Sequence, residues 1–264
     1  MTIANMANSN DLISLFIMPE LSLTLLVAVF AVFFVSGIIK GFLGIGLPAA
    51  AMAFLTLFID PRTAISLMVL PIFFTNSLQY LRAPEPRETA REYWLFALAI
   101  FISIFITSLF INSVPTALLT VSIGFAMVVF SLQLLSGVKL PVTDARIWQV
   151  GVGIFAGVLG GLSSIWSPPV AMYLLARNVD KDKFISATGF LFLAGCLPLF
   201  AGLVIAGVVT YVSLAKSLFG LIAVLIGFRC GEILRGYVSQ QLFRRAVLTA
   251  FLIMGLRLIV TGFA

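Results

Sequence analysis

The sequence predicts an all-α polytopic membrane protein made of two inverted repeats with broken or re-entrant helices. Three observations carry this prediction. The 264 residues are 61% hydrophobic and 10% charged, which is outside the range of soluble domains. Apolar stretches of about 20 residues, the length that crosses a bilayer as a helix, recur along the chain. A glycine-rich motif that is followed by a proline occurs twice, in residues 37–52 and 153–172.

We expect about eight full spans plus short half-helices, because seven apolar stretches are long enough to cross and the shorter ones can be re-entrant or crossing. The long candidates lie at roughly 21–40, 62–81, 93–111, 115–136, 184–205, 213–229 and 241–262. Three further stretches, 48–59, 147–160 and 168–178, are too short to cross at a rise of about 1.5 Å per residue. Such short segments are typical of broken helices, whose unwound backbone must be buried in protein or line a wet cavity.

Basic residues predict the orientation. Most of the 16 lie in segments 82–92, 139–146, 177–183 and 229–245, whereas the connections INSVP, GLSSIWS, AGVVTYVS and the C-terminal TGFA hold none. By the positive-inside rule the first set is cytoplasmic. We therefore expect a multi-pass membrane protein whose C-terminus lies outside the cytoplasm. The N-terminal residues lack a signal-peptide signature, so we expect the first span to be retained as an anchor.

The two glycine-rich motifs align with each other, which indicates an internal duplication. With a shift of 116 residues the glycines match at Gly37/Gly153, Gly41/Gly157 and Gly44/Gly160. With a shift of 120 the matches continue at Pro48/Pro168, Asp60/Asp180 and Ser66/Ser186. Because the charge pattern starts the halves from opposite sides, we expect residues 1–138 and 139–264 to form inverted repeats of four or five membrane segments each. This arrangement is typical of secondary transporters, whose substrate lies near the midplane between the repeats.

Each break is expected to supply half of an anion site. A helix that begins at Pro48 or Pro168 suits proline, because the first helical position needs no N–H. Two such helix ends would direct free N–H groups and positive dipoles at one anion. Hydroxyl, amide and indole donors suit a tetrahedral oxyanion, whereas close helix packing is the alternative role of the glycines. The candidate binding residues are Gly44, Gly46, Pro48, Asn76, Ser163, Ser164, Trp166, Ser167 and Pro168.

Two basic residues have two interpretations each. Lys40 directly precedes the first glycine loop, and Arg257 lies inside the last span. Either residue attracts the anion along its path, or its side chain snorkels to the membrane surface. We count both as candidate binding residues.

Several other functions lack the residues they need. The chain has no histidine and no GxxxxGK[ST] loop, so we expect neither an enzyme nor ATP hydrolysis by a phosphate loop. Cys196 and Cys230 lack CxxC spacing, so we expect no metal and no cofactor. The net charge of +6 is spread between apolar spans, which does not suit nucleic acid. The expected partners are a small anion and the lipid bilayer, and a homodimer stays open.

The repeated motifs carry a family resemblance. GFLGIGLP and GVLGGLSSIWSPP, each followed by a short apolar helix and an aspartate at Asp60 or Asp180, resemble the TauE/SafE family of sulfite and sulfonate membrane transporters, of the toluene sulfonate uptake permease type. The resemblance covers nearly the whole chain and implies a permease for sulfite, sulfoacetate, related organosulfonates or thiosulfate. It also implies that the membrane is the bacterial inner membrane, so the C-terminus is expected in the periplasm. The alternatives are an anion channel of the same architecture, a carrier for a small carboxylate, and a non-transporting scaffold or sensor. Export and uptake both stay open.

Overall fold

The computed structural model describes residues 23–84, 86–137, 142 and 145–263. Within these ranges the chain forms eleven α-helices, one short 3-10 helix and no strand, which confirms an all-α polytopic membrane protein. The N-terminal segment before residue 23 and Lys139, both used in the sequence predictions, lie outside the described residues. Seven helices are long and apolar enough to span a membrane: α2 (Leu23–Leu43), α4 (Pro61–Leu81), α7 (Thr116–Ser136), α8 (Arg146–Ser163), α10 (Lys181–Ile205), α11 (Tyr211–Leu234) and α12 (Gln240–Phe263).

An eighth span is formed if a bent pair of helices is counted as one. α5 (Pro86–Glu92) and α6 (Trp94–Leu109) meet at an angle of 73°. A 3-10 turn, η2 (Ile111–Ser113), then leads into α7. With this pair the described chain has up to eight spans, which agrees with the number that the sequence predicts.

The prediction that residues 147–160 are too short to span is wrong. α8 continues through its glycines and covers 18 residues. These glycines pack against α6 and do not break the helix: a Cβ at Gly153 would lie 2.7 Å from the Cβ of Ala99, and a Cβ at Gly157 would lie 2.5 Å from the Cβ of Ser103. Small residues at this interface allow the two helices to approach closely.

The other two short stretches are short helices. α3 (Leu47–Leu55) and α9 (Ser167–Ala176) each end before an aspartate that caps the next long helix. The carboxylate of Asp60 accepts from the backbone N–H of Arg62 at 2.9 Å, and that of Asp180 accepts from the N–H of Lys183 at 2.9 Å. The repeated aspartate is therefore an N-cap, a role that this side chain fills well.

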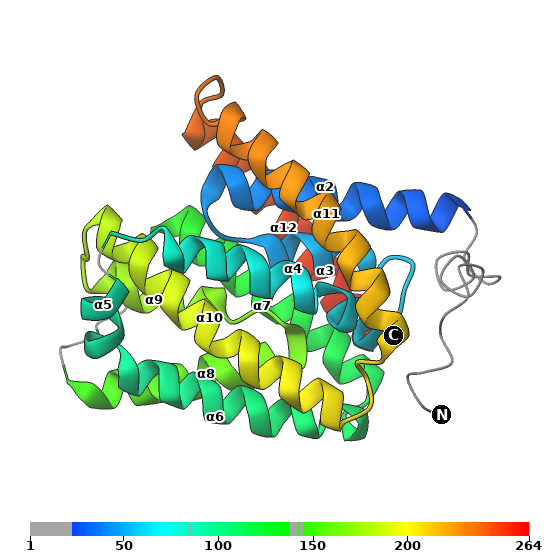
Figure 1. The fold of residues 1–264 in the computed structure, drawn as a ribbon, viewed down its shortest axis with the longest axis horizontal. Helices are drawn as coiled ribbons and strands as arrows, with labels where there is room; N and C mark the ends of the chain where they lie inside the picture. The colour runs from blue at the N-terminus through cyan, green and yellow to red at the C-terminus, as the bar shows by residue number, and fades with distance from the viewer. Residues whose placement is uncertain (1–22, 85, 138–141, 143–144, 264) are drawn as a thin grey trace, which may run out of the picture.

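Long helices from the two halves of the chain pack against one another. α2 lies along α11, α8 lies along α6, α7 lies along α12, and α4 meets α10 in the centre. Figure 1 shows α6, α8 and α10 together at the lower edge, with α2 and α11 crossing at the upper edge. If α2, α4, α6 and α7 correspond to α8, α10, α11 and α12, each of these pairs maps onto another or onto itself. A two-fold relation between the halves predicts this pattern.

Polar contacts tie the helix ends together at two faces of the bundle. At one face, Arg82 at the end of α4 lies 3.7 Å from Glu232 of α11, and Lys183 of α10 pairs with Glu92 of α5 at 2.5 Å. We call this end the basic face. At the opposite face the guanidinium of Arg62 donates to the hydroxyl of Thr116 at 2.8 Å.

Candidate functional site

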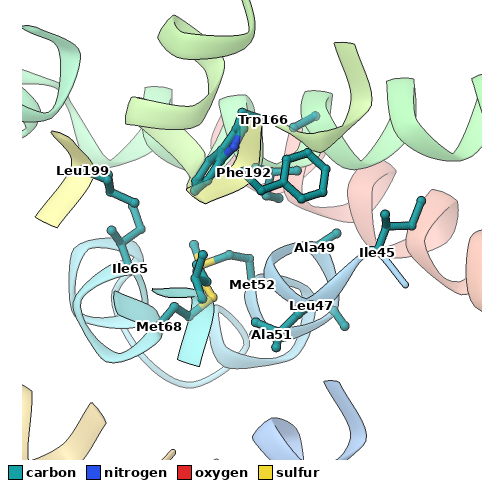
Figure 2. Packing of buried hydrophobic residues seen from close by; sticks show 14 of the residues in the cluster. Ile45, Leu47, Ala49, Ala51, Met52, Ile65, Met68, Trp166, Phe192 and Leu199 are labelled. Atoms are coloured by element: carbon teal, nitrogen blue, oxygen red, sulfur yellow. The ribbon is translucent and has the colours of Figure 1, made fainter. Parts of the chain in front are cut away.

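The two short helices direct their N-termini at one enclosed cavity inside the bundle. Both halves contribute to its lining, and its free volume of about 10 Å³ corresponds to roughly one water molecule. Figure 2 shows Trp166 and Phe192 on one side, across from Ala49 and Met52 of α3. The residues that line the cavity are Lys40, Gly46, Pro48, Asn76, Trp166, Ser167 and Phe192.

The first of these helix ends depends on glycine. Gly46 is the N-cap of α3 and has φ of 96°, and Gly44 has φ of 79°. Residues other than glycine rarely adopt these positive φ values. α3 begins at Leu47, so Pro48 occupies the second helical position and not the first as predicted. The N–H groups of Leu47 and Ala49 stay free of intrahelical partners, as in any first turn.

The second helix end is poorer in backbone donors than the sequence predicts. α9 begins at Ser167, and Pro168 and Pro169 follow directly. Because proline has no N–H, only Ser167 offers one among the first three helical positions. Side chains must therefore supply most of the hydrogen bonds on this side of the cavity.

Two buried side chains next to α9 have donors without a partner. The indole N–H of Trp166 and the hydroxyl of Ser167 belong to side chains that are 2% and 5% exposed, and neither has a hydrogen-bond partner within the described structure. Leaving a buried donor unpaired costs about 1–3 kcal/mol. Both residues line the cavity, so an acceptor held there would satisfy them.

Lys40 brings a full positive charge to the same cavity. The residue is 3% exposed, its ammonium donates to Oδ1 of Asn76, and Nζ lies 5.9 Å from the centre of the Phe192 ring. Within the described ranges no carboxylate forms an ion pair with it. The snorkelling interpretation of Lys40 is therefore wrong, because the end of α2 is packed inside the bundle and does not reach the surface.

Asn76 is held by contacts on both sides of its amide. Its Oδ1 accepts from Lys40, and its Nδ2 lies 3.5 Å from Sγ of Cys196. The thiol of Cys196 in turn donates to the carbonyl of Phe192 at 3.1 Å. Phe192 and Cys196 were not among the predicted site residues. Cys196 could have been found from the repeat, because it lies 120 residues after Asn76.

The remaining predicted residues do not line this cavity. The hydroxyl of Ser163 donates to the carbonyl of Leu159 at 2.6 Å and accepts from the N–H of Ile165 at 3.1 Å, so it stabilises the loop. Ser164 closes α8 with φ of 58°, and its hydroxyl is buried without a partner in the described structure. Pro168 is buried within α9.

Arg257 lies apart from this group. Its side chain is exposed on α12, and it lines none of the three cavities described in this section. Gly44 does not line the enclosed cavity, but it does line a wider cavity beside it.

That wider cavity, of about 480 Å³, opens at the basic face and reaches Lys40. We call it the basic-face vestibule. Its charged lining residues are Lys40, Arg82, Glu232 and Arg235. Lys40 thus lines the vestibule and the enclosed cavity together.

A third cavity, of about 400 Å³, lies at the opposite face. It includes Arg62 and Lys216 and extends along α4 only as far as Leu67. Between Leu67 and Asn76 on the same helix, Met68 and Ile72 are 0% and 2% exposed. In this structure the enclosed cavity is therefore close to the vestibule and separated from the opposite face by packed apolar side chains.

A comparison of the sequence with models of protein families gives a match. The sequence model of the family described as "Sulfite exporter TauE/SafE" matches residues 29–258, which is most of the chain. No curated protein and no solved structure matches. The chain therefore belongs to the sulfite exporter TauE/SafE family, and as a member it is a membrane transporter of sulfite-type anions.

Proposed function

We propose that this protein is a secondary transporter that moves small sulfur-containing anions, such as sulfite, sulfoacetate or other organosulfonates, across the bacterial inner membrane. The anion binds in the enclosed cavity between the two short helices. One observation carries the proposal: three buried donors, Lys40, Trp166 and Ser167, line this cavity. Within the described residues Lys40 has no counter-charge, and the side chains of Trp166 and Ser167 have no hydrogen-bond partner.

The number and placement of the donors favour a sulfur oxyanion over a carboxylate. The ammonium of Lys40 comes from α2, and the indole and hydroxyl of Trp166 and Ser167 come from the start of α9. Three donor groups, one from α2 and two from the start of α9, suit the three oxygens of a sulfite or sulfonate group, whereas a carboxylate has two. The free N–H groups at the start of α3 add donors and a positive dipole end.

The closed geometry supports a carrier more than a channel. A channel needs a continuous path that ions can leave quickly. Here the cavity holds roughly one water, and Met68 and Ile72 are packed between it and the opposite face. Transport would therefore require the two halves to move so that the site opens to one face at a time.

We also propose that residues 1–138 and 139–264 are inverted repeats, with the basic face in the cytoplasm and the C-terminus in the periplasm. The exchange of packing partners between the halves supports the repeat, and the positive-inside rule supports the orientation. An inside-negative potential favours anion exit by about 2.3 kcal/mol per charge per 100 mV, so export needs no coupled cation. A homodimer stays a prediction.

Flux into liposomes tests the proposal. Purified protein is reconstituted, and uptake of labelled sulfite and sulfoacetate is followed with an imposed potential of either sign. We expect saturable uptake that follows the potential and is inhibited by methanesulfonate but not by acetate. Ohmic, non-saturable current would favour the channel, and inhibition by acetate alone would favour a carboxylate carrier.

A further inference from the structure

Within the described residues, the ammonium of Lys40 has no fixed counter-charge. It is buried, donates to the neutral amide of Asn76 and lies over the ring of Phe192. The positive ends of α3 and α9 face the same cavity and add to its positive potential. The empty site is therefore positively charged, and burying such a charge is costly unless it is paired.

The vestibule does not supply the missing charge. Among the described residues that line it, Glu232 is the only carboxylate. That carboxylate already pairs with Arg229 at 2.9 Å and lies 3.7 Å from Arg82. Arg235 donates to the carbonyls of Gly41 and Phe42. The vestibule is thus basic as well, and it attracts anions without neutralising Lys40.

If the site closes to the basic face and opens to the opposite face, the ammonium of Lys40 must pass through a state in which apolar side chains surround it. Lys40 lines the basic-face vestibule, whereas the opposite cavity stops at Leu67. Asn76 lies nine positions after Leu67, which corresponds to roughly 13 Å along α4. While the site passes from one face to the other it must be closed to both, and the ammonium then loses its contact with the vestibule.

We propose that the protein works as an anion exchanger, in which the site reorients readily only when an anion occupies it. The bound anion neutralises Lys40 in the closed state, whereas the empty site would have to bury an unpaired ammonium. One small oxyanion therefore leaves as another enters. The counter-anion belongs to the same chemical class as the substrate, because it must accept from Lys40, Trp166 and Ser167. This inference rests on the proposed function.

The comparison of exchange with net flux tests it. Liposomes that contain the protein are loaded with labelled sulfoacetate, and the potential is clamped with potassium and valinomycin so that charge build-up does not limit efflux. The external medium contains either unlabelled sulfoacetate or gluconate, an anion that has a carboxylate and no sulfur oxyanion group. We expect efflux into sulfoacetate to be faster by about tenfold or more.

The two possible failures are distinguishable. Equal efflux into both media would overturn the exchange mechanism and leave the proposed transport function intact. No efflux of sulfoacetate or of sulfite into either medium would overturn both.

A charge variant tests the physical cause. Lys40→Gln removes the ammonium, so we expect net efflux to approach exchange in rate even if affinity falls. Lys183→Gln is the matched control, because Lys183 pairs with Glu92 at the basic face and lines none of the three cavities. It should keep the wild-type ratio of the two rates. A Lys40→Gln protein that retains the wild-type ratio would overturn the assigned cause, and if that variant is inactive, the wild-type comparison decides.

Discussion

Asn76 and Cys196 are 120 residues apart in the chain and touch in the structure, with Nδ2 of Asn76 at 3.5 Å from Sγ of Cys196. The same shift relates Pro48 to Pro168. In a two-fold arrangement a residue meets its own counterpart only near the axis. The contact therefore supports an inverted duplication whose axis passes by the wall of the enclosed cavity, which is where such transporters bind substrate.

Replacement of Lys40 by glutamine should weaken anion binding while leaving the protein folded. A hydrogen bond to a charged group contributes about 1.5–3 kcal/mol, so we expect the Kd for sulfoacetate to rise by about ten- to a hundredfold. Calorimetric titration of purified protein in detergent measures this change. Lys183→Gln should keep the wild-type Kd. If Lys40→Gln bound the anion as tightly as the wild type, Lys40 would not contact it.

The unpaired donors should matter for binding and not for stability. Trp166→Phe and Ser167→Ala each remove a buried donor that has no partner in the described structure. We expect each to raise the Kd about tenfold without lowering the Tm, since no hydrogen bond of the empty protein is lost. Anion titration and thermal unfolding followed by circular dichroism separate the two effects.

Ser163 provides the contrast for these two variants. Its hydroxyl makes hydrogen bonds at 2.6 Å to Leu159 and 3.1 Å to Ile165. Ser163→Ala should therefore lower the free energy of unfolding by about 1 kcal/mol or more and leave the Kd of folded protein nearly unchanged. The opposite pattern, with weak binding at Ser163→Ala and lower stability at Trp166→Phe, would place the anion elsewhere in the loop.

Gly46→Ala should impair the site through the backbone. At φ of 96° an alanine is strained by about 1–2 kcal/mol, and relief of the strain would shift the first turn of α3. Gly137→Ala is the matched control, because Gly137 ends α7 at φ of 67° and an added Cβ there would meet no atom within 4 Å. We expect both variants to lower the Tm and only Gly46→Ala to raise the Kd. Equal affinities would show that the cap geometry does not set the site.

Glycines of the long helices should affect assembly and not selectivity. A Cβ at Gly227 of α11 would lie 2.0 Å from the carbonyl oxygen of Phe34 in α2, so Gly227→Ala must push these helices apart. We expect little monodisperse protein in size-exclusion chromatography. Gly151→Ala places its methyl group in open space on α8 and should give the wild-type yield. A normal yield from Gly227→Ala would mean that the helix pair adapts.

The length of each apolar stretch predicted most of the fold, because the bilayer sets how many residues a span needs. The error at α8 came from treating every glycine as a break. Gly153 and Gly157 stay helical because their small size fits the groove along α6, whereas Gly46 has a positive φ and caps a helix. Sequence spacing does not separate these two uses of glycine, since both place it inside an apolar run.

The site was predictable where polar residues interrupt that apolar background. Asn76, Trp166 and Ser167 stand out for this reason, and all three line the cavity. Phe192 was not predictable, because an aromatic residue in an apolar span carries no signal of its own. The sequence also did not decide between the two roles of Arg257, because packing against α7 determines which face of α12 points outward.

The halves of this chain have become unequal around the axis they are proposed to share. At shifts of 116 and 120 residues, Lys40 corresponds to Ala156 and Gly46 to Trp166. A protein rebuilt from two copies of the first half would bring two ammonium groups and no indole to the axis. Two copies of the second half would bring two indoles and no ammonium. Neither half could therefore assemble with a second copy of itself into the proposed site, which needs one ammonium and one indole.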